Sequence, residues 1–130
     1  MVGSILTLNA GSSSLKFAIF DGTPSLKARV RGEIEDLDAA PHLLTRDTDG
    51  SVLAERRWPA GTRLPFAVAL DTLLEFADAH LGRDGLAAVG HRVVHGGVDH
   101  IAPEVVTPAL LAALEALTPL DPLHMRRHCQ

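Results

Sequence analysis

The segment Asn-Ala-Gly-Ser-Ser-Ser-Leu-Lys, which runs from Asn9 to Lys16, contains residue types that could bind a phosphate group together with a metal ion. Gly11 can adopt a positive φ at little cost, and Ser12 and Ser14 supply hydroxyl groups beside backbone N–H groups. Successive N–H donors in a tight turn form a concave anion site, to which Lys16 adds a positive charge. The amide oxygen of Asn9 suits a hard cation such as magnesium, or its water shell.

This segment is not a Walker A loop, because that motif requires Gly before the Lys and Ser or Thr after it. Leu15 and Phe17 flank Lys16 instead, and no helix is predicted to follow. A polar hairpin turn whose serines only satisfy their own backbone would have the same composition, since Ser and Gly dominate turns. Composition alone therefore leaves two interpretations, a phosphate site and a plain turn.

A second polar segment, His-Arg-Val-Val-His-Gly-Gly, runs from His91 to Gly97. His91 and His95 have the spacing of zinc-binding helices, but the two valines and the flanking glycines favour a strand. In a strand these residues lie roughly 13 Å apart, too far to share one ion, so we interpret them as hydrogen-bonded strand histidines. Arg92 presents a guanidinium near the strand end, suited to a carboxylate or phosphate, and an ion pair with Asp99 is the alternative.

Five strands joined by short turns are predicted in the first half of the chain. Apolar and β-branched residues mark them, and they alternate with charged residues after position 26. The predicted strands are Ser4–Ala10, Leu15–Phe20, Leu26–Ile34, His42–Arg46 and Ser51–Trp58. Asp21-Gly22 is a favoured hairpin dipeptide, and Asp47 to Gly50 is predicted to form another turn.

The pattern changes at Pro65, where a helix is predicted. Its apolar stripe consists of Phe66, Leu70, Leu73, Leu74, Ala77 and Leu81, opposite the acidic residues Asp71, Glu75 and Asp78. Pro65 suits the first helical turn, and Gly82 suits the position just after the end. Leu86–Val94 is predicted to be a buried strand, and Thr107-Pro108 to begin a short helix through Leu117. The fold class is therefore α/β, a mixed sheet with antiparallel strands and flanking helices.

Composition excludes several classes of protein. With 130 residues and 46% hydrophobic residues, the chain can form one domain with a real core, and intrinsic disorder is disfavoured. Its net charge of −4 and scattered basic residues disfavour nucleic-acid binding. No apolar run approaches the ~20 residues of a membrane span. The absence of a secretory signal and the single Cys129 fit a cytoplasmic, reducing location.

Taken together, the two polar segments resemble motifs of the acetate kinase family. The matches run from Ile5 to Phe17 and from Val89 to Gly97. A shorter third match, Pro122-Leu123-His124, continues into Met125 where family members usually have Asn or Gln and then Pro. The resemblance implies the N-terminal part of an actin-like, sugar-kinase-type ATPase domain with a ribonuclease H-like motif over residues 1–118. Residues 119–130 would be an extended tail, truncated or out of frame.

The resemblance also implies magnesium-dependent phosphoryl transfer between ATP and acetate, giving acetyl phosphate and ADP. By position, Gly11, Ser12, Ser14 and Lys16 would bind ATP, Asn9 the magnesium ion, and Arg92 and His124 the substrate. No catalytic residue is assigned, because the family's later catalytic acid, histidine and arginine have no counterpart here. We therefore expect this chain to be inactive alone, although full-length relatives would be homodimers. The alternatives are a non-catalytic anion-binding or interaction module, and a propionate or butyrate kinase fragment.

Overall fold

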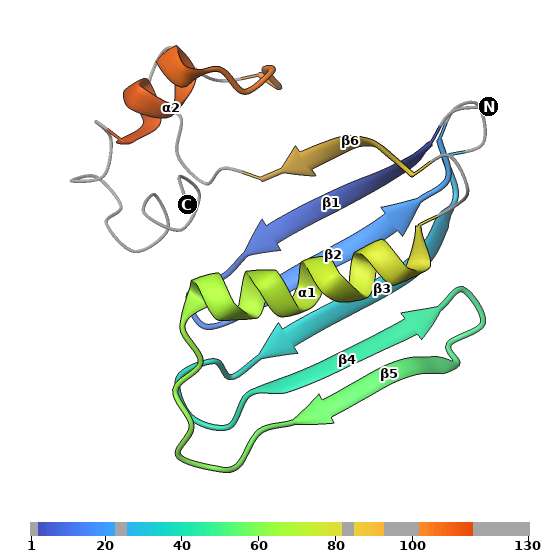
Figure 1. The fold of residues 1–130 in the computed structure, drawn as a ribbon, viewed down its shortest axis with the longest axis vertical. Coiled ribbons are helices and arrows are strands. Elements are labelled where there is room, and N and C mark those ends of the chain that lie inside the picture. Colours follow the sequence, from blue (N-terminus) through green and yellow to red (C-terminus); the bar gives the residue numbers. More distant parts are fainter. Residues whose placement is uncertain (1–2, 23–25, 82–84, 93–101, 116–130) are drawn as a thin grey trace. The chain divides into compact units, whose positions relative to one another are not determined.

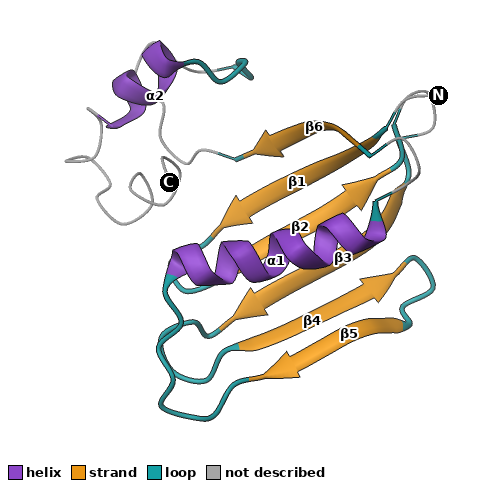
Figure 2. Ribbon diagram, in the orientation of Figure 1, coloured by secondary structure: helices purple, strands orange, loops and turns teal. Residues whose placement is uncertain are grey.

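Six strands form one mixed sheet in the computed structural model, which describes residues 3–22, 26–81, 85–92 and 102–115 (Figures 1 and 2). In sequence order the elements are β1 (Ser4–Ala10), β2 (Leu15–Phe20), β3 (Ala28–Glu35), β4 (His42–Asp47), β5 (Val52–Arg57), α1 (Phe66–His80), β6 (Leu86–His91) and α2 (Pro108–Glu115). Contacts divide the chain into two units, Met1–His91 and Arg92–Gln130. The sheet and α1 belong to the first unit, and α2 belongs to the second.

The strand order is β5-β4-β3-β2-β1-β6, and each pair from β1 to β5 is antiparallel. Strand β6 instead pairs parallel with β1, because the chain crosses over through α1 before returning to the sheet. The predicted mixed sheet is thereby confirmed. The turn between β4 and β5 is also confirmed: the carboxylate of Asp47 accepts hydrogen bonds from the N–H groups of Asp49 and Ser51, and Gly50 has φ +83°.

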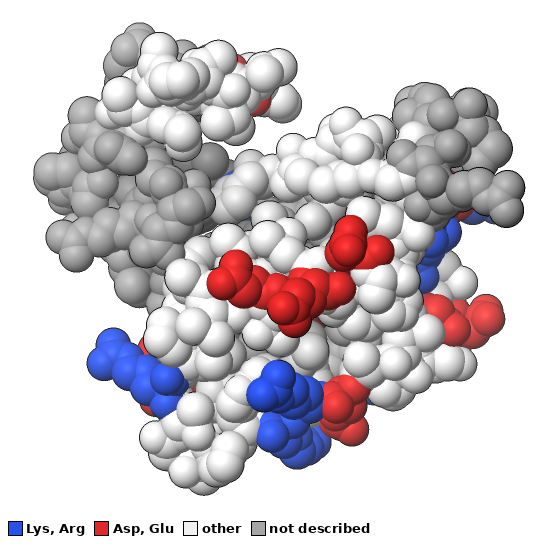
Figure 3. Space-filling model, viewed as in Figure 1, with Lys and Arg blue, Asp and Glu red and all other residues white. Residues whose placement is uncertain are grey.

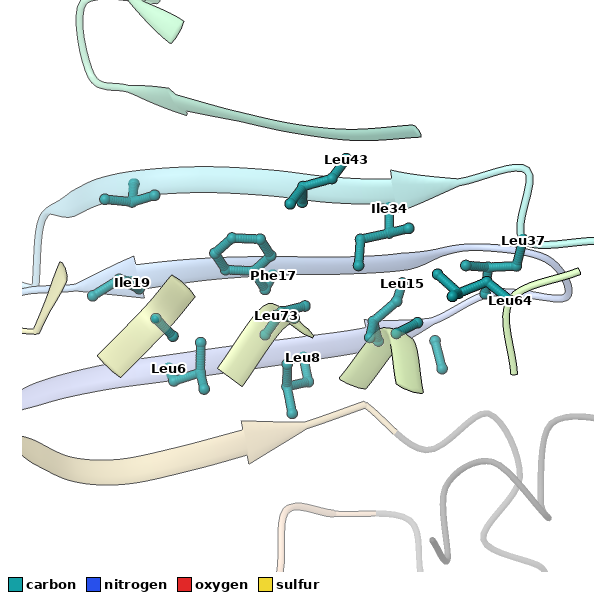
Figure 4. Close-up of a cluster of buried hydrophobic side chains, with 14 residues drawn as sticks. Leu6, Leu8, Leu15, Phe17, Ile19, Ile34, Leu37, Leu43, Leu64 and Leu73 are labelled. Carbon is teal, nitrogen blue, oxygen red and sulfur yellow. The ribbon is translucent and has the colours of Figure 1, made fainter. Parts of the chain in front are cut away.

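The hydrophobic core lies between α1 and one face of the sheet (Figure 4). Alternate residues of β1 and β2 point to this face, so Leu6 and Leu8 pack near Phe17 and Ile19. The helix contributes Leu73, which is fully buried, together with Ala69 and Ala77. The opposite face of β1 and β2 therefore carries Asn9 and Lys16 of the predicted site.

The predicted helical stripe is partly wrong. The buried residues of α1 are Ala69, Leu73 and Ala77, whereas Leu74 is 40% exposed. Four-residue steps from Ala69 fix the inward direction, and Leu74 lies about 100° away from Leu73 around the helix. Pro65 also precedes the helix as its N-cap residue rather than lying within the first turn.

Acidic side chains follow the outer surface of α1, as expected. Asp71, Glu75 and Asp78 are exposed and form the red row across the middle of Figure 3. Their spacing of three and four residues places them on one side of the helix. The outer surface of α1 is therefore negatively charged along its length.

One predicted connection and one predicted strand differ from the structure. Asp21-Gly22 does not form a two-residue hairpin turn, because β3 begins only at Ala28 and the N–H of Asp21 donates to the carbonyl of Lys27. Strand β6 ends at His91 instead of continuing through Arg92, and it is exposed rather than buried. Within the described residues it is an edge strand that pairs only with β1, so Leu86 and Val89 remain 44% and 51% exposed.

Helix α2 begins as the sequence predicts. The hydroxyl oxygen of Thr107 accepts a hydrogen bond from the N–H of Leu110 at 3.1 Å, which is an N-cap interaction. The helix runs from Pro108 to Glu115, and the predicted last turn, up to Leu117, lies outside the described residues.

A histidine held between carboxylates links three strands of the sheet. Nε2 of His42 lies 2.7 Å from the Glu55 carboxylate on β5, and Nδ1 lies 3.6 Å from Glu35 on β3. The hydrogen bond from His42 lowers the pKa of Glu55 below its usual 4.5, and the charge of Arg57 acts in the same direction. The ionised form of Glu55 therefore stabilises the folded state.

This pKa shift predicts a specific pH dependence. Because the pKa of Glu55 is lower in the folded state, its contribution is fully present above about pH 4.5 and is lost as the pH falls through the lowered value. Glu55→Gln should therefore lower the urea midpoint at pH 7, and the difference from the parent protein should shrink on acidification. Glu75→Gln on α1 controls for the lost charge. A pH-independent Glu55→Gln difference would contradict the assignment.

Candidate functional site

Three polar residues lie side by side across the sheet on the face opposite α1. Asn9 of β1 is the register partner of Lys16 on β2, and Lys16 is the register partner of Glu33 on β3. Their neighbours Leu8 and Phe17 point into the core, so the three polar side chains alternate to the other face. Directly opposed residues have Cβ atoms about 5 Å apart. The fold thus forms a row of an amide, an ammonium and a carboxylate.

The Gly11–Ser14 loop joins β1 to β2 immediately beside this row. The N–H of Gly11 donates to the carbonyl of Ser14 at 2.9 Å, and the N–H of Leu37 donates to the carbonyl of Ser13 at 3.0 Å. The first bond closes the turn and the second fixes it to the connection between β3 and β4. The loop is therefore anchored at both its base and its middle.

Gly11 suits this loop for a reason other than the predicted one. Positive φ values occur at Gly50, Gly61 and Gly85 among the described glycines, and not at Gly11. A Cβ atom at Gly11 would instead lie 2.6 Å from Oγ of Ser14. The glycine permits the close approach of Ser14 rather than a left-handed turn.

Several donors of the loop have no acceptor among the residues that the structure describes. Within the described part of the chain, the N–H groups of Ser12, Ser13 and Ser14 donate no hydrogen bond to another residue. The side chain of Asn9 likewise has no partner there. The interpretation of a plain turn whose serines satisfy the backbone accounts for none of these groups, whereas an anion would accept from them.

Lys16 faces an open depression of about 470 Å³ over β2 to β4. Its side chain is 62% exposed, and its Nζ lies 3.7 Å from the carboxylate of Glu33, which is 36% exposed. Glu33 also lines the depression and was not found by sequence analysis. The sequence does predict that Glu33 lies on the solvent-exposed face of a strand. It does not provide the strand register that places Glu33 opposite Lys16.

The structure does not place the remaining predicted site residues relative to this row. Arg92 is exposed and directly follows β6 in the chain, but it belongs to the second unit. His95 and His124 lie outside the described residues. The predicted ATP and metal residues Asn9, Gly11, Ser12, Ser14 and Lys16 lie together in one loop and its two flanking strands, and the structure adds Glu33 beside Lys16.

The donor set suits magnesium in one respect. Asn9 provides an amide oxygen, which is a ligand type that magnesium and its bound waters accept. Among the described residues, no three His, Cys, Asp or Glu side chains are grouped to hold a metal ion. Magnesium would therefore keep most of its ligands as water and phosphate oxygens, as it commonly does.

Comparison with known proteins connects this geometry to a family. The model of the acetokinase family matches residues 4–130, which is nearly the whole chain. The chain belongs to the acetokinase family. Two similar relatives are the acetate kinases of Nitrobacter hamburgensis and Rhodopseudomonas palustris strain TIE-1, which are 36% and 39% identical to it. The matches cover 93% and 92% of this chain but 30% of each relative, so the chain spans less than a third of their length.

Solved structures agree with the acetokinase assignment. A propionate kinase from Francisella tularensis matches with a TM-score of 0.76 and 26% identity, covering 99% of this chain and 32% of that one. Porphyromonas gingivalis acetate kinase matches with a TM-score of 0.73 and 26% identity, covering 98% and 32%. The expected actin-like ATPase fold is thereby confirmed for this portion of an acetokinase. None of the helices in the described ranges is long and apolar enough to cross a membrane.

Proposed function

We propose that this acetokinase chain is the phosphate-binding part of an enzyme that transfers a phosphoryl group between ATP and acetate, with acetyl phosphate and ADP as products. The observation that supports this function is the loop between Asn9 and Lys16, with its three unused N–H groups beside an exposed ammonium group. Family membership supports the same chemistry. Residues 1–118 form the partial ATPase domain, and residues 119–130 form its tail.

Each residue of the loop has a distinct role in this proposal. Gly11, Ser12 and Ser14 present backbone and hydroxyl donors to the phosphates of ATP, and Lys16 offsets their charge. Asn9 holds hydrated magnesium, which would neutralise charge on the transferring group. Arg92 and His124 bind the acetate or acetyl phosphate side. Acetate is already ionised at neutral pH, so no general base is needed to activate it.

The 130-residue chain by itself is proposed to bind ATP without turning it over. In-line transfer requires groups that position both anions, and the family's later catalytic acid, histidine and arginine have no counterpart in these residues. Cytoplasmic location and a homodimeric full-length protein belong to the same proposal. The alternative, a non-catalytic anion-binding module, would bind anions with the same loop but would not be part of an enzyme that transfers phosphate.

Propionate is the second candidate substrate. This alternative is supported by the match to a solved propionate kinase, which has the same fold over this segment as the acetate kinase. Acetate and propionate differ by one methylene, which is worth ~1–3 kcal/mol in a pocket. Competition between the two acids in a full-length enzyme that contains this segment would distinguish them.

Replacement of Lys16 tests the proposed function directly. Lys16→Met should weaken MgATP binding by about 10- to 100-fold, because a hydrogen bond to a charged group is worth ~1.5–3 kcal/mol. The chain contains only one other lysine, Lys27, which is exposed before β3. Lys27→Met is therefore a control of matched chemistry and should bind like the parent. Amide chemical shifts of Gly11 to Ser14, followed during a MgATP titration, would measure both affinities.

Two outcomes would contradict the proposal. One is the absence of saturable MgATP shifts at the loop in the folded parent chain, and the other is equal affinity of the Lys16 and Lys27 variants. An acetyl phosphate assay on the same samples tests the separate claim that the chain alone is inactive, which detectable turnover would disprove.

A further inference from the structure

We propose that Glu33 is a positioning residue for Lys16, which it holds on the sheet face at the β2 end that adjoins the phosphate-binding loop. This inference rests on the proposed function and adds a residue that neither the sequence motifs nor the family assignment provides. The structural basis is the row Asn9–Lys16–Glu33, in which Glu33 is the register partner of Lys16 and lies 3.7 Å from its Nζ.

Glu33 is the acid best placed to restrain Lys16. On β1 the neighbour of Lys16 is the neutral Asn9, and on β2 the next residue of the same face is Ala18. On β3 the flanking residues of that face are Arg31, which lies over the Phe20 ring, and Glu35, which pairs with His42. Within the described residues, Glu33 is the only ion-pair partner of Lys16. Without it, the lysine stem would sample solvent freely.

The carboxylate is held more firmly than the ammonium. Strand β3 lies inside the sheet between β2 and β4, so its backbone is hydrogen-bonded on both sides. Leu44 of β4 lies opposite Glu33, and Gly32 beside it is pressed against Phe17 in the core. The side chain of Glu33 is 36% exposed, against 62% for Lys16. The less exposed carboxylate thus limits the directions available to the more exposed ammonium.

The charge of Glu33 has two opposing effects on anion binding. A carboxylate repels phosphate, so its charge alone weakens binding. Holding Lys16 in place lowers the rotamer entropy lost when the ligand is bound and so strengthens binding. The sign of the effect of Glu33→Gln therefore separates the two roles.

The test measures MgATP affinity for Glu33→Gln, with Glu35→Gln as a control that removes the same charge from the same strand and face. Positioning predicts that Glu33→Gln weakens binding by about 2- to 5-fold, the range expected for an exposed ion pair. It also predicts that Glu35→Gln leaves binding unchanged or tighter. In the Lys16→Met background, the effect of Glu33→Gln should disappear. Tighter or unchanged binding in Glu33→Gln, or an effect that persists without Lys16, would overturn the proposal.

A second readout does not depend on nucleotide binding. NMR relaxation of the lysine Cε groups should show Lys16 more ordered than Lys27, and Glu33→Gln should remove that difference. Equal order of Lys16 in the parent and the variant would overturn the positioning role even if MgATP binds. Absence of MgATP binding with Lys16 ordered by Glu33 would instead overturn the proposed function and leave the ion pair standing. The two failures are therefore distinguishable.

Discussion

Replacing Gly32 by alanine should destabilise the first unit by about 1–3 kcal/mol or more, the usual cost of overpacking a core. A Cβ atom at this position would lie 2.6 Å from Cζ of Phe17 and 2.7 Å from Cγ2 of Thr45. Both neighbours are buried, so neither can move into solvent. Relief would require β3 to move away from both β2 and β4, which would also disturb the pairing of Glu33 with Lys16. Urea denaturation and MgATP titration of the same variant would measure both effects.

A second strand glycine provides the control for Gly32→Ala. Gly90 on β6 has room, since a Cβ atom there would meet Cγ2 of Thr7 at an ordinary 3.8 Å. Gly90→Ala should therefore be close to neutral. Combining Gly32→Ala with Phe17→Leu should recover part of the lost stability, because the smaller side chain removes the ring that the new methyl group meets. Equal stability of Gly32→Ala and Gly90→Ala would contradict this account.

Truncation of Leu73 to alanine is expected to cost about 2–5 kcal/mol, the range for a buried leucine. Leu73 is fully buried and is the central contact of α1 with the sheet (Figure 4). No other layer covers this part of the sheet in the described residues, so the cavity would lie at the middle of the core. The expected result is a large fall in the urea midpoint with the far-UV helix signal retained at low denaturant.

The adjacent residue makes a close control for Leu73→Ala. Leu74 has the same side chain in the same helix but is 40% exposed. Leu74→Ala should cost less than ~1 kcal/mol, because most surface substitutions change stability little. A similar loss in both variants would mean that the helix presents a different face to the sheet.

Local patterns in the sequence predicted the elements well but not their register. The five antiparallel strands and the helix follow from alternation, helical spacing and turn residues. The pairing of Lys16 with Glu33 does not, because it depends on the length of the connection between β2 and β3. A tight turn at Asp21-Gly22 would have set Lys16 opposite Lys27 instead. The longer connection and the irregularity at Ile19 and Phe20 shift the partner to Glu33.

Burial was the other property that local sequence could not supply. The run from Leu86 to Val89 is as apolar as a core strand, and its exposure follows from its place at the edge of the described sheet. Leu74 similarly lies on the predicted apolar stripe of α1, but the side of the helix that faces the sheet is the one with Ala69, Leu73 and Ala77. The exposure of β6 and that of Leu74 both depend on contacts between segments that are distant in the sequence. The loop from Asn9 to Lys16 was recognisable because all its parts are consecutive in the chain.

The position of β1 inside the sheet has a consequence for how the chain folds as it is synthesised. Leu6 pairs with Ile19 on one side and with Val89 on the other, and closing the longer loop costs roughly 1.6 kcal/mol more entropy. The ribosome adds about 5–20 residues per second, so β1 to β5 can pair seconds before β6 exists. During that interval β1 has an open edge, where another nascent chain could pair. Synthesis through α1 and β6 then covers the edge of β1, and within the described sheet the open edge moves to β6.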